Sequence, residues 1–528
     1  MKKIEETAGP SMPPLTPDQF QESEVEPAWS GLTSKVAIGS IWGIAGQGAI
    51  LLTSLLATPF TLRLLNTEQY GLLALVNLIL NYLALSDLGM QVASTRFATA
   101  AHVEHGDTEE SRVIWTSFAV TLIPSISIIV ILVLTAPMLA TRAFQIPPPL
   151  RTQAQSAFAL MAVIILLRNL AGIANTPQLV RLRFYLFTII TTGGTVVQMV
   201  AIPFVLYFIS TNLQIVVLTM AICSLCTLVA HLSVSRRLLP ALARPQFSRK
   251  IAKDLISFGV SLVGMTLLAI TLNMERLLLA RFSSLTAVAY YSVAYTLASL
   301  PLIASTALGQ ALIPAFSRLH AMALPGILTN LFFRCLRVLA LLAIPMIFAL
   351  CFLGKPLLRI WGGAVYATHA SFPLYVLVLG TLLDCFAVVP RILIKSIDKP
   401  YVIVPVQLVL LVPYLGLGFL LVLKFGALGA AFAFSSRALV EFVLVYRYAV
   451  KKYVSHSWMS TSVFMRWVCA LGILLCPFLV EPQALLFRLL AITALGSYVW
   501  YGHTFLLEGT ERLWIRNQMN QLLGVGRP

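Results

Sequence analysis

The chain has 528 residues, of which 59% are hydrophobic and only 11% are charged, and its mean hydropathy is +0.88. A soluble domain carries about 25% charged residues, so this chain has too few polar side chains to cover a surface that faces water. Its net charge of +17 comes from basic residues scattered between apolar runs, which excludes the clustered basic surface of a nucleic-acid-binding protein.

The N-terminal segment differs from the rest of the chain. Residues 1–35 are polar and acidic, contain several prolines, and have no apolar core behind Lys2 and Lys3. A cleaved signal peptide needs such a core. We therefore predict a disordered cytoplasmic tail over residues 1–35.

Apolar runs then follow one another up to residue 506. A helix needs about 20 apolar residues to cross the hydrocarbon layer, because it rises about 1.5 Å per residue and must satisfy every backbone polar group internally. The sequence predicts an all-α polytopic membrane protein with about fourteen transmembrane helices, or twelve if one pair does not cross. The predicted spans are 36–60, 70–88, 113–138, 154–174, 184–209, 213–233, 256–274, 286–313, 337–353, 372–394, 401–423, 426–447, 466–480 and 485–506.

The basic residues indicate how these spans are oriented. Most of the 37 lysines and arginines fall in every second connection, beginning with the N-terminal tail. Basic residues are enriched in cytoplasmic connections. We therefore expect a multi-pass protein of the bacterial inner (plasma) membrane with both termini in the cytoplasm.

The chain divides into two halves around its longest basic connection. On either side of this connection an apolar helix closes on an arginine (Arg63, Arg281), a short polar turn follows, and a tyrosine (Tyr70, Tyr290) opens the next helix. Duplicated six-helix units are common in transporters. We predict an N-lobe over 36–234, a cytoplasmic linker over 235–255, a C-lobe over 256–450, and a C-terminal helix pair with a cytoplasmic tail over 451–528.

The sequence contains no recognisable enzyme site. The connections after residue 35 are short, and we find no Walker A, GxSxG or HExxH pattern and no paired histidines suited to acid–base work. Cys223 and Cys226 form a CxxC inside an apolar run, where packing is the expected role. We therefore expect a protein that is not an enzyme and has no metal or cofactor.

Three stretches resemble a known family. Two are FSRKIAKDLISFGVSLVG (247–264) and FGALGAAFAFSSRALVEF (425–442). The third, residues 59–100, contains Pro59, Arg63, the turn Glu68-Gln69-Tyr70-Gly71, and Asp87-Leu88-Gly89 followed by Arg96. With these motifs the chain resembles the polysaccharide transporter family, the O-antigen and exopolysaccharide flippases of the multidrug/oligosaccharidyl-lipid/polysaccharide (MOP) flippase superfamily.

The resemblance implies a V-shaped bundle of two six-helix lobes. Such a protein would move an undecaprenyl-pyrophosphate-linked oligosaccharide from the cytoplasmic to the periplasmic leaflet by alternating access, for O-antigen, capsule or exopolysaccharide synthesis. Its partners would be this lipid-linked oligosaccharide, membrane lipids, and the polysaccharide polymerase and export machinery, and H⁺ or Na⁺ would be the candidate coupling ion.

Three alternatives remain open at the level of sequence. A multidrug or cation antiporter of the same superfamily would favour buried carboxylates over arginines, whereas these spans carry both, with cations ahead. A membrane polysaccharide polymerase or ligase would need a sizeable periplasmic loop, and none is predicted. A structural scaffold for a synthesis complex is the third alternative.

Charged residues inside the spans are the candidate cavity residues. A charge in the hydrocarbon region is costly unless it faces a cavity or a partner, and arginine suits phosphate because its planar fork binds oxygens in pairs. Arg168 and Asn175 share one face of the fourth span, and Arg437 and Glu441 are spaced to pair with each other on the twelfth. The remaining candidates are Asp384, Arg391 and Lys395, within about 20° of one stripe of the tenth span, and Asn77 and Asn81 on the second.

A second group of residues is predicted to form an outer gate. Arg63 and the Glu275-Arg276 pair are expected at the periplasmic ends of the first and seventh helices, in equivalent places of the two repeats. They would open and close the passage by ion pairing, or else anchor the helices at the interface. Arg96 is placed in the first cytoplasmic connection, outside the cavity.

Overall fold

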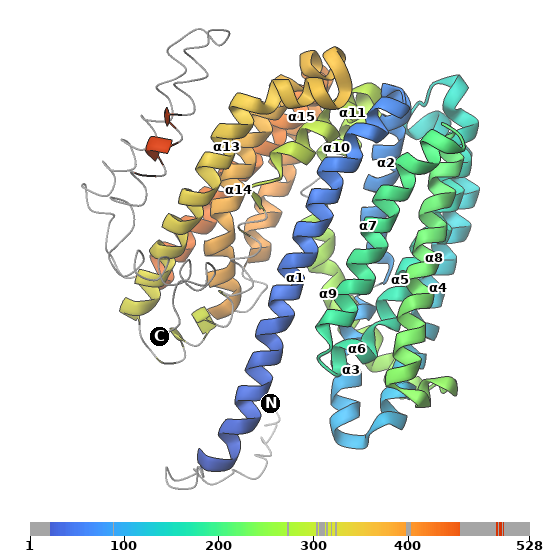
Figure 1. Ribbon diagram of the computed structural model, residues 1–528, viewed down its shortest axis with the longest axis vertical. Coiled ribbons are helices and arrows are strands. Elements are labelled where there is room, and N and C mark those ends of the chain that lie inside the picture. The colour runs from blue at the N-terminus through green and yellow to red at the C-terminus, as the bar shows by residue number, and fades with distance from the viewer. Residues whose placement is uncertain are drawn as a thin grey trace, which may run out of the picture.

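The structure is a computed structural model and describes residues 22–87, 89–271, 274–302, 325–397 and 403–454, with isolated positions at 305–322 and 493–500. The described part is helical and contains no strand, as predicted. Figure 1 shows two groups of helices that lie together at the end where α2 and α11 begin and spread apart at the end where α3 finishes and α9 begins. We call these the closed end and the open end.

The first half holds eight helices and three short turns. The short turns are η2 (Ala84–Asp87), the π-helical turn η3 (Leu139–Ala143) and η4 (Pro148–Leu150). The helices are α1 (Glu22–Leu64), α2 (Thr67–Leu83), α3 (Met90–His105), α4 (Asp107–Met138), α5 (Arg151–Ala174), α6 (Thr176–Val180), α7 (Phe184–Phe208) and α8 (Leu213–Leu238).

The second half begins after the short turn η5 (Pro240–Ala243). Two of its long helices bend at glycines with positive φ, Gly363 (79°) and Gly426 (53°), which other residues rarely adopt. Its helices are α9 (Arg249–Thr271), α10 (Glu275–Phe282), α11 (Leu285–Ala298), α13 (Pro325–His369), α14 (Ser371–Ile397) and α15 (Ile403–Tyr453).

Each of the first twelve predicted spans overlaps a described helix. Among the described residues, eight helices or joined helices are long and apolar enough to cross a membrane. The predicted spans 466–480 and 485–506 lie almost entirely outside the described residues, as do residues 1–21 of the predicted tail. Within the rest of that tail, α1 already begins at Glu22.

The second and seventh spans are broken rather than continuous. The helix predicted over 70–88 stops at Leu83, turns through η2, and continues as α3. Arg96, predicted to lie in a connection, is thus part of a helix, α3, which runs to His105. The seventh span likewise has two parts, α9 and α10, on either side of residues 272–274.

Three clusters of buried apolar side chains explain the shape. The largest, which we call the shared core, contains Leu72, Leu75 and Phe158 of the first half together with Tyr291 and Leu374 of the second. Inside a bilayer, van der Waals packing of such side chains holds helices together, because lipid tails are as apolar as the side chains. The shared core therefore joins both halves at the closed end.

The other two large clusters lie at the open end and are separate. The first-half core contains Met90 and Ile114 and is joined by Leu255 of α9. The second-half core contains Phe332 and Val389, from α13 and α14. Among the described residues, α9 is thus the element of the second half that packs into the first-half core at the open end.

Backbone contact holds the closed end tightly. A Cβ added to Gly71 of α2 would overlap the carbonyl oxygen of Leu285 at the start of α11. Both helices begin with a side-chain cap, since Asn66 accepts from the Gln69 amide at 2.8 Å and Ser284 from the Ala287 amide at 3.1 Å. Each cap lies three residues after the arginine near the end of the preceding helix, Arg63 or Arg281.

The linker predicted over residues 235–255 is bound to α4. The Trp115 indole donates to the Leu242 carbonyl at 3.0 Å, and the Ser111 hydroxyl donates to the Ala241 carbonyl at 3.0 Å. The Thr116 hydroxyl accepts from the Ser248 amide at 3.2 Å, one residue before α9 begins. These bonds attach the start of α9 to the first half.

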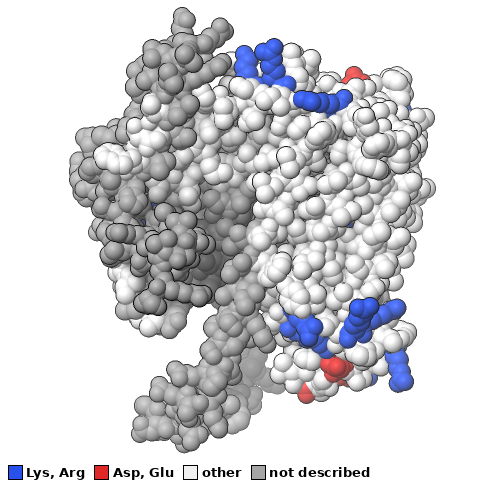
Figure 2. Space-filling model, in the orientation of Figure 1, with Lys and Arg blue, Asp and Glu red and all other residues white. Residues whose placement is uncertain are grey.

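Figure 2 shows that charged side chains gather at the two ends of the visible face, with an uncharged belt between them.

Candidate functional site

Arg276 and Glu275 lie at the start of α10, on the open-end side of the shared core. Three residues further on, Leu279 is already fully buried in that core. The Arg276 guanidinium carbon lies 4.1 Å from the centre of the Tyr295 ring and 5.6 Å from that of Tyr291. Arg276 makes no ion pair with a carboxylate in the described part of the chain, so aromatic faces carry its charge.

The Glu275 carboxylate is bound by two buried tyrosines. Its residue surface is 1% exposed. The Tyr291 hydroxyl donates to Oε1 at 3.1 Å and the Tyr414 hydroxyl donates to Oε2 at 2.5 Å. A buried carboxylate is costly unless such donors satisfy it, so this arrangement holds α10 against α11 and α15.

These positions correct the predicted outer gate. Glu275 and Arg276 begin α10 rather than end a helix, because the seventh span breaks before them; Arg281 occupies the place equivalent to Arg63, next to last in its helix. Arg63 does reach the other half, but its Nη2 donates to the Ile360 carbonyl of α13 at 2.6 Å and not to a carboxylate. The closing contact at this position is thus a hydrogen bond.

Four predicted cavity residues meet between α14 and α15. Arg391 Nη2 lies 2.5 Å from Asp384 Oδ1 and its Nη1 lies 3.5 Å from Glu441 Oε1. Arg437 Nη1 lies 2.7 Å from Glu441 Oε2, which is the pairing predicted from their spacing. Glu441 and Arg437 are buried, whereas Asp384 and Arg391 keep about a fifth of their side-chain surface exposed (20% and 22%).

An aromatic contact connects this network to Arg276. The Tyr295 ring meets the Phe434 ring edge-on at 5.6 Å, and the guanidinium of Arg437 lies 5.1 Å from the centre of the Phe434 ring. Residues of α10, α11, α15 and α14 therefore form one continuous chain of polar and aromatic contacts. It follows the border between the shared core and the second-half core.

The other predicted cavity residues are not gathered in this chain. Arg168 is exposed on α5 and donates to Gln198 of α7 at 3.3 Å. Asn175 does not share that exposed face, because α5 ends at Ala174 and Asn175 is the buried capping residue, 3% exposed. Lys395 is exposed near the end of α14.

Two asparagines of α2 differ from each other in environment. Asn77 is half-buried and its amide donates to the Leu73 carbonyl of its own helix at 3.0 Å. Asn81, one turn further on, is exposed. Only Asn81 therefore presents its side chain freely at the end of α2.

A neutral polar cluster lies at the matching depth of the first half. The buried Asn169 amide donates to the Ser86 hydroxyl at 2.8 Å and to the Ser125 hydroxyl at 3.1 Å. Its neighbours on α5 belong to the shared core on one side (Ile165) and to the first-half core on the other (Ile173). Sequence analysis did not identify this cluster, because serines and asparagine carry no charge signal.

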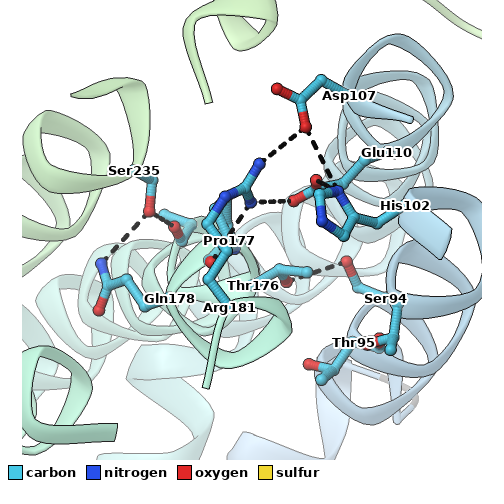
Figure 3. Close-up of polar contacts among 12 residues, drawn as sticks. Ser94, Thr95, His102, Asp107, Glu110, Thr176, Pro177, Gln178, Arg181 and Ser235 are labelled. Atoms are coloured by element: carbon cyan, nitrogen blue, oxygen red, sulfur yellow. Dashed lines mark hydrogen bonds and ion pairs between the residues drawn. The ribbon is translucent and has the colours of Figure 1, made fainter. Parts of the chain in front are cut away.

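A larger ionic cluster lies at the open end of the first half. Arg181, which follows α6, pairs with Glu110 at 2.7 Å and Asp107 at 3.0 Å, and His102 Nδ1 lies 2.9 Å from Glu110 (Figure 3). The donor set His102, Asp107 and Glu110 could geometrically hold a metal ion. Arg181 already pairs with both carboxylates, however, so the cluster ties α3, α4 and the end of α6 together.

The fold defines a class of protein. It resembles a lipid II flippase, MurJ, with a TM-score of 0.68 at 12% identity, covering 89% of this chain and 98% of that one. It also resembles a multidrug resistance MATE family transporter of the MOP superfamily, with a TM-score of 0.62 at 13% identity, covering 76% of this chain and 94% of that one. The chain has the fold of the MOP superfamily transporters.

The sequence places the chain within that class more narrowly. Residues 61–370 match the model of the polysaccharide biosynthesis protein family, and the chain belongs to that family. A Shigella flexneri protein provisionally described as an O-antigen transporter is 23% identical over 410 residues, covering 77% of this chain and 96% of that protein. The prediction of a membrane transporter of this superfamily, and not an enzyme, is confirmed by these relatives.

Sequence analysis missed two features of the candidate site. Tyr291 and Tyr295, which contact Glu275 and Arg276, stand in the stretch AVAYYSVAY, and several tyrosines in one apolar span are a signal that could have been used. Arg96 was missed because the second span was ended at Leu88, although Gly89 followed by a polar helix indicates a break rather than an end.

Proposed function

We propose that this protein is a flippase that moves an undecaprenyl-pyrophosphate-linked oligosaccharide from the cytoplasmic to the periplasmic leaflet. The observation that carries the proposal is Arg276. It is an arginine held by aromatic rings, without a carboxylate partner among the described residues, on the open-end side of the core that joins the two halves. Such a cation suits a diphosphate that enters between the halves.

The buried carboxylates favour this substrate over a cationic drug. Glu275 is engaged by Tyr291 and Tyr414, and Glu441 is paired with Arg437 and Arg391. Asp384 is paired with Arg391. A cation antiporter needs a carboxylate free to receive its substrate, and these three are occupied.

The arrangement of the cores supports alternating access. The shared core joins the two halves at the closed end, whereas among the described residues the first-half and second-half cores at the open end are separate, which is the arrangement of a passage that opens at that end (Figure 1). With the N-terminus in the cytoplasm, as the basic residues predict, this is the cytoplasmic side. Movement of the two halves about the shared core would then expose the substrate to the periplasm.

Transport in vesicles tests the proposal. Proteoliposomes containing the full-length protein and a fluorescent polyprenyl-pyrophosphate disaccharide are expected to move the lipid to the other leaflet, whereas empty vesicles are not. Arg276→Gln is expected to lower the flux about tenfold or more, because a charge-assisted contact to phosphate is lost. Arg142→Gln, an exposed arginine of the closed end, is the matched control. A wild-type flux equal to that of empty vesicles, or an Arg276→Gln flux equal to that of the wild type, would contradict the proposal.

Coupling is a separate part of the proposal. Asp384 and Glu441 are the carboxylates of this network through which H⁺ or Na⁺ would act, and binding of either ion would release the arginine that pairs with the carboxylate. Undiminished flux after the ion gradients are collapsed would exclude both ions. The product would pass to a polysaccharide polymerase and the export machinery of O-antigen, capsule or exopolysaccharide synthesis.

A further inference from the structure

A hollow on α3 lies apart from the predicted cavity residues. Its volume is about 540 Å³, and it is lined by Gln91, Val92, Thr95, Arg96, Thr99 and Leu179. Small-molecule sites usually have volumes of about 300–1,000 Å³. Five of the lining residues belong to α3 and the sixth to α6, so the hollow lies at the open end of the first half.

Polar side chains are regularly spaced in a lining whose accessible surface is otherwise mainly apolar. Gln91, Thr95 and Thr99 are spaced i, i+4 and i+8, which places their side chains along one stripe of the helix. The hydroxyls of Thr95 and Thr99 donate to the carbonyls of Gln91 and Thr95, at 3.0 and 2.7 Å. Their oxygens therefore remain acceptors for the hydroxyl groups of a sugar.

Arg96 gives the hollow a positive charge. It is exposed and makes no ion pair with a carboxylate in the described part of the chain; its guanidinium carbon lies 4.5 Å from the centre of the Phe258 ring. Thr95 precedes Arg96 on α3. Ser94 and Thr176 lie between Thr95 and the ionic cluster (Figure 3). The carboxylates Asp107 and Glu110 of that cluster are taken by Arg181 and His102.

Phe258 connects this arginine to the other half. It lies on α9, and its ring also meets Phe97 edge-on at 6.0 Å. A cation–π contact at an exposed position is weaker than a paired arginine–phosphate contact. A phosphate that enters the hollow would therefore draw Arg96 away from Phe258.

We propose that this hollow is an entry subsite for the diphosphate of the lipid-linked substrate. Arg96 binds the diphosphate, and the stripe of Gln91, Thr95 and Thr99 contacts the first sugar, before the substrate reaches Arg276. Occupancy releases the Arg96–Phe258 contact and so loosens α3 from α9 at the open end. The proposal rests on the proposed function and adds to it a first binding position.

Binding to the purified full-length protein tests the proposal. The protein is placed in nanodiscs of zwitterionic lipid and titrated with undecaprenyl pyrophosphate, and bound lipid is counted by native mass spectrometry. Arg96→Gln is expected to weaken binding about tenfold or more. Arg183→Gln, which removes an exposed arginine from the same end but outside the hollow, is expected to bind as the wild type does.

A second variant separates binding from structure. Phe258→Leu removes the ring but keeps the cation, so it is expected to bind undecaprenyl pyrophosphate at least as tightly as the wild type. If Phe258→Leu weakens binding as much as Arg96→Gln, the arginine only holds α3 to α9 and the proposal is overturned. Unchanged binding by Arg96→Gln also overturns it.

Competition identifies the source of the phosphate. Inorganic pyrophosphate is expected to displace the lipid from the wild type and to do so about tenfold less well from Arg96→Gln. If phosphatidylglycerol displaces the lipid as well as pyrophosphate does, and only when Arg96 is present, the hollow binds anionic membrane lipids. That result would overturn the proposal of a diphosphate subsite. If the wild type binds and transports the lipid and Arg96→Gln does so equally well, this inference alone is overturned. If the wild type neither binds nor transports the lipid, the proposed function is contradicted as well.

Discussion

In each half a polar border lies between the shared core and that half's own core at the open end, and the two borders differ in chemistry. In the first half the border is the neutral cluster of Asn169 with Ser86 and Ser125. In the second half it is an ionic network in which Arg437 and Glu441 are almost fully buried. The free-energy cost of burying a hydroxyl or amide group is small when the group is hydrogen-bonded, whereas a buried charge needs a charged partner.

This difference assigns the two halves different tasks. The second half holds its charged residues in a fixed chain that leads to Arg276, so it is suited to recognise a charged group at one place. The first half offers two exposed cations, Arg96 and Arg168, that make no ion pair with a carboxylate in the described part of the chain. The comparison predicts that mutations in the second half affect folding more than equivalent mutations in the first.

The largest effect is expected from Glu441→Leu. The substitution leaves Arg437 buried without its nearest carboxylate, and breaking a buried pair on one side costs about 3–5 kcal/mol in free energy of unfolding. Reversible unfolding by dodecyl sulfate in mixed micelles measures it. The double variant Arg437→Leu with Glu441→Leu is expected to recover most of the loss, and a double variant as unstable as the single one would contradict the account.

Gly71→Ala tests what joins the halves. The new Cβ would overlap the Leu285 carbonyl oxygen, which is backbone and cannot turn aside, so we expect a loss of about 1–3 kcal/mol and separation of α2 from α11. The same unfolding measurement applies. Gly48→Ala on α1, where no atom lies within 4 Å of the added Cβ, is the control and should leave stability unchanged or slightly raised.

Asn169→Ala sharpens the contrast between the two borders. It removes two hydrogen bonds between neutral groups, which are worth about 0.5–1.5 kcal/mol each, and leaves no charge unpaired. Its cost should therefore be clearly smaller than that of Glu441→Leu in the same assay. Equal costs would mean that the ionic and neutral borders do not differ as described.

The smallest effect on stability is expected from Arg63→Gln. Its bond to the Ile360 carbonyl is exposed and is worth about 1 kcal/mol or less, so the free energy of unfolding should hardly change. The closed end should nevertheless open more often, by about two- to fivefold. A cysteine at the buried Leu73, in a background without the native cysteines, reports this as faster reaction with a membrane-impermeant maleimide. Arg359→Gln, exposed at the same end, should react no faster than the parent.

The helices were predictable from sequence because each must be apolar along about 20 residues. The breaks within the second and seventh spans were not, because Gly89 and the residues before Glu275 lie inside runs that are apolar on average. These breaks placed Arg96 inside a helix and moved Glu275 and Arg276 away from the helix end. The pairing of Arg437 with Glu441 was predictable, since it depends only on a local spacing.

The sequence by itself determined an all-helical membrane protein, and its motifs pointed to the family. Only the tertiary structure decided which charges meet. The approach of Arg391 to Asp384 and Glu441, of Glu275 to Tyr414, and of Arg96 to Phe258 depends on how separate helices rotate and pack. Hydropathy carries little information on that rotation, because the faces directed at lipid and at the core are both apolar.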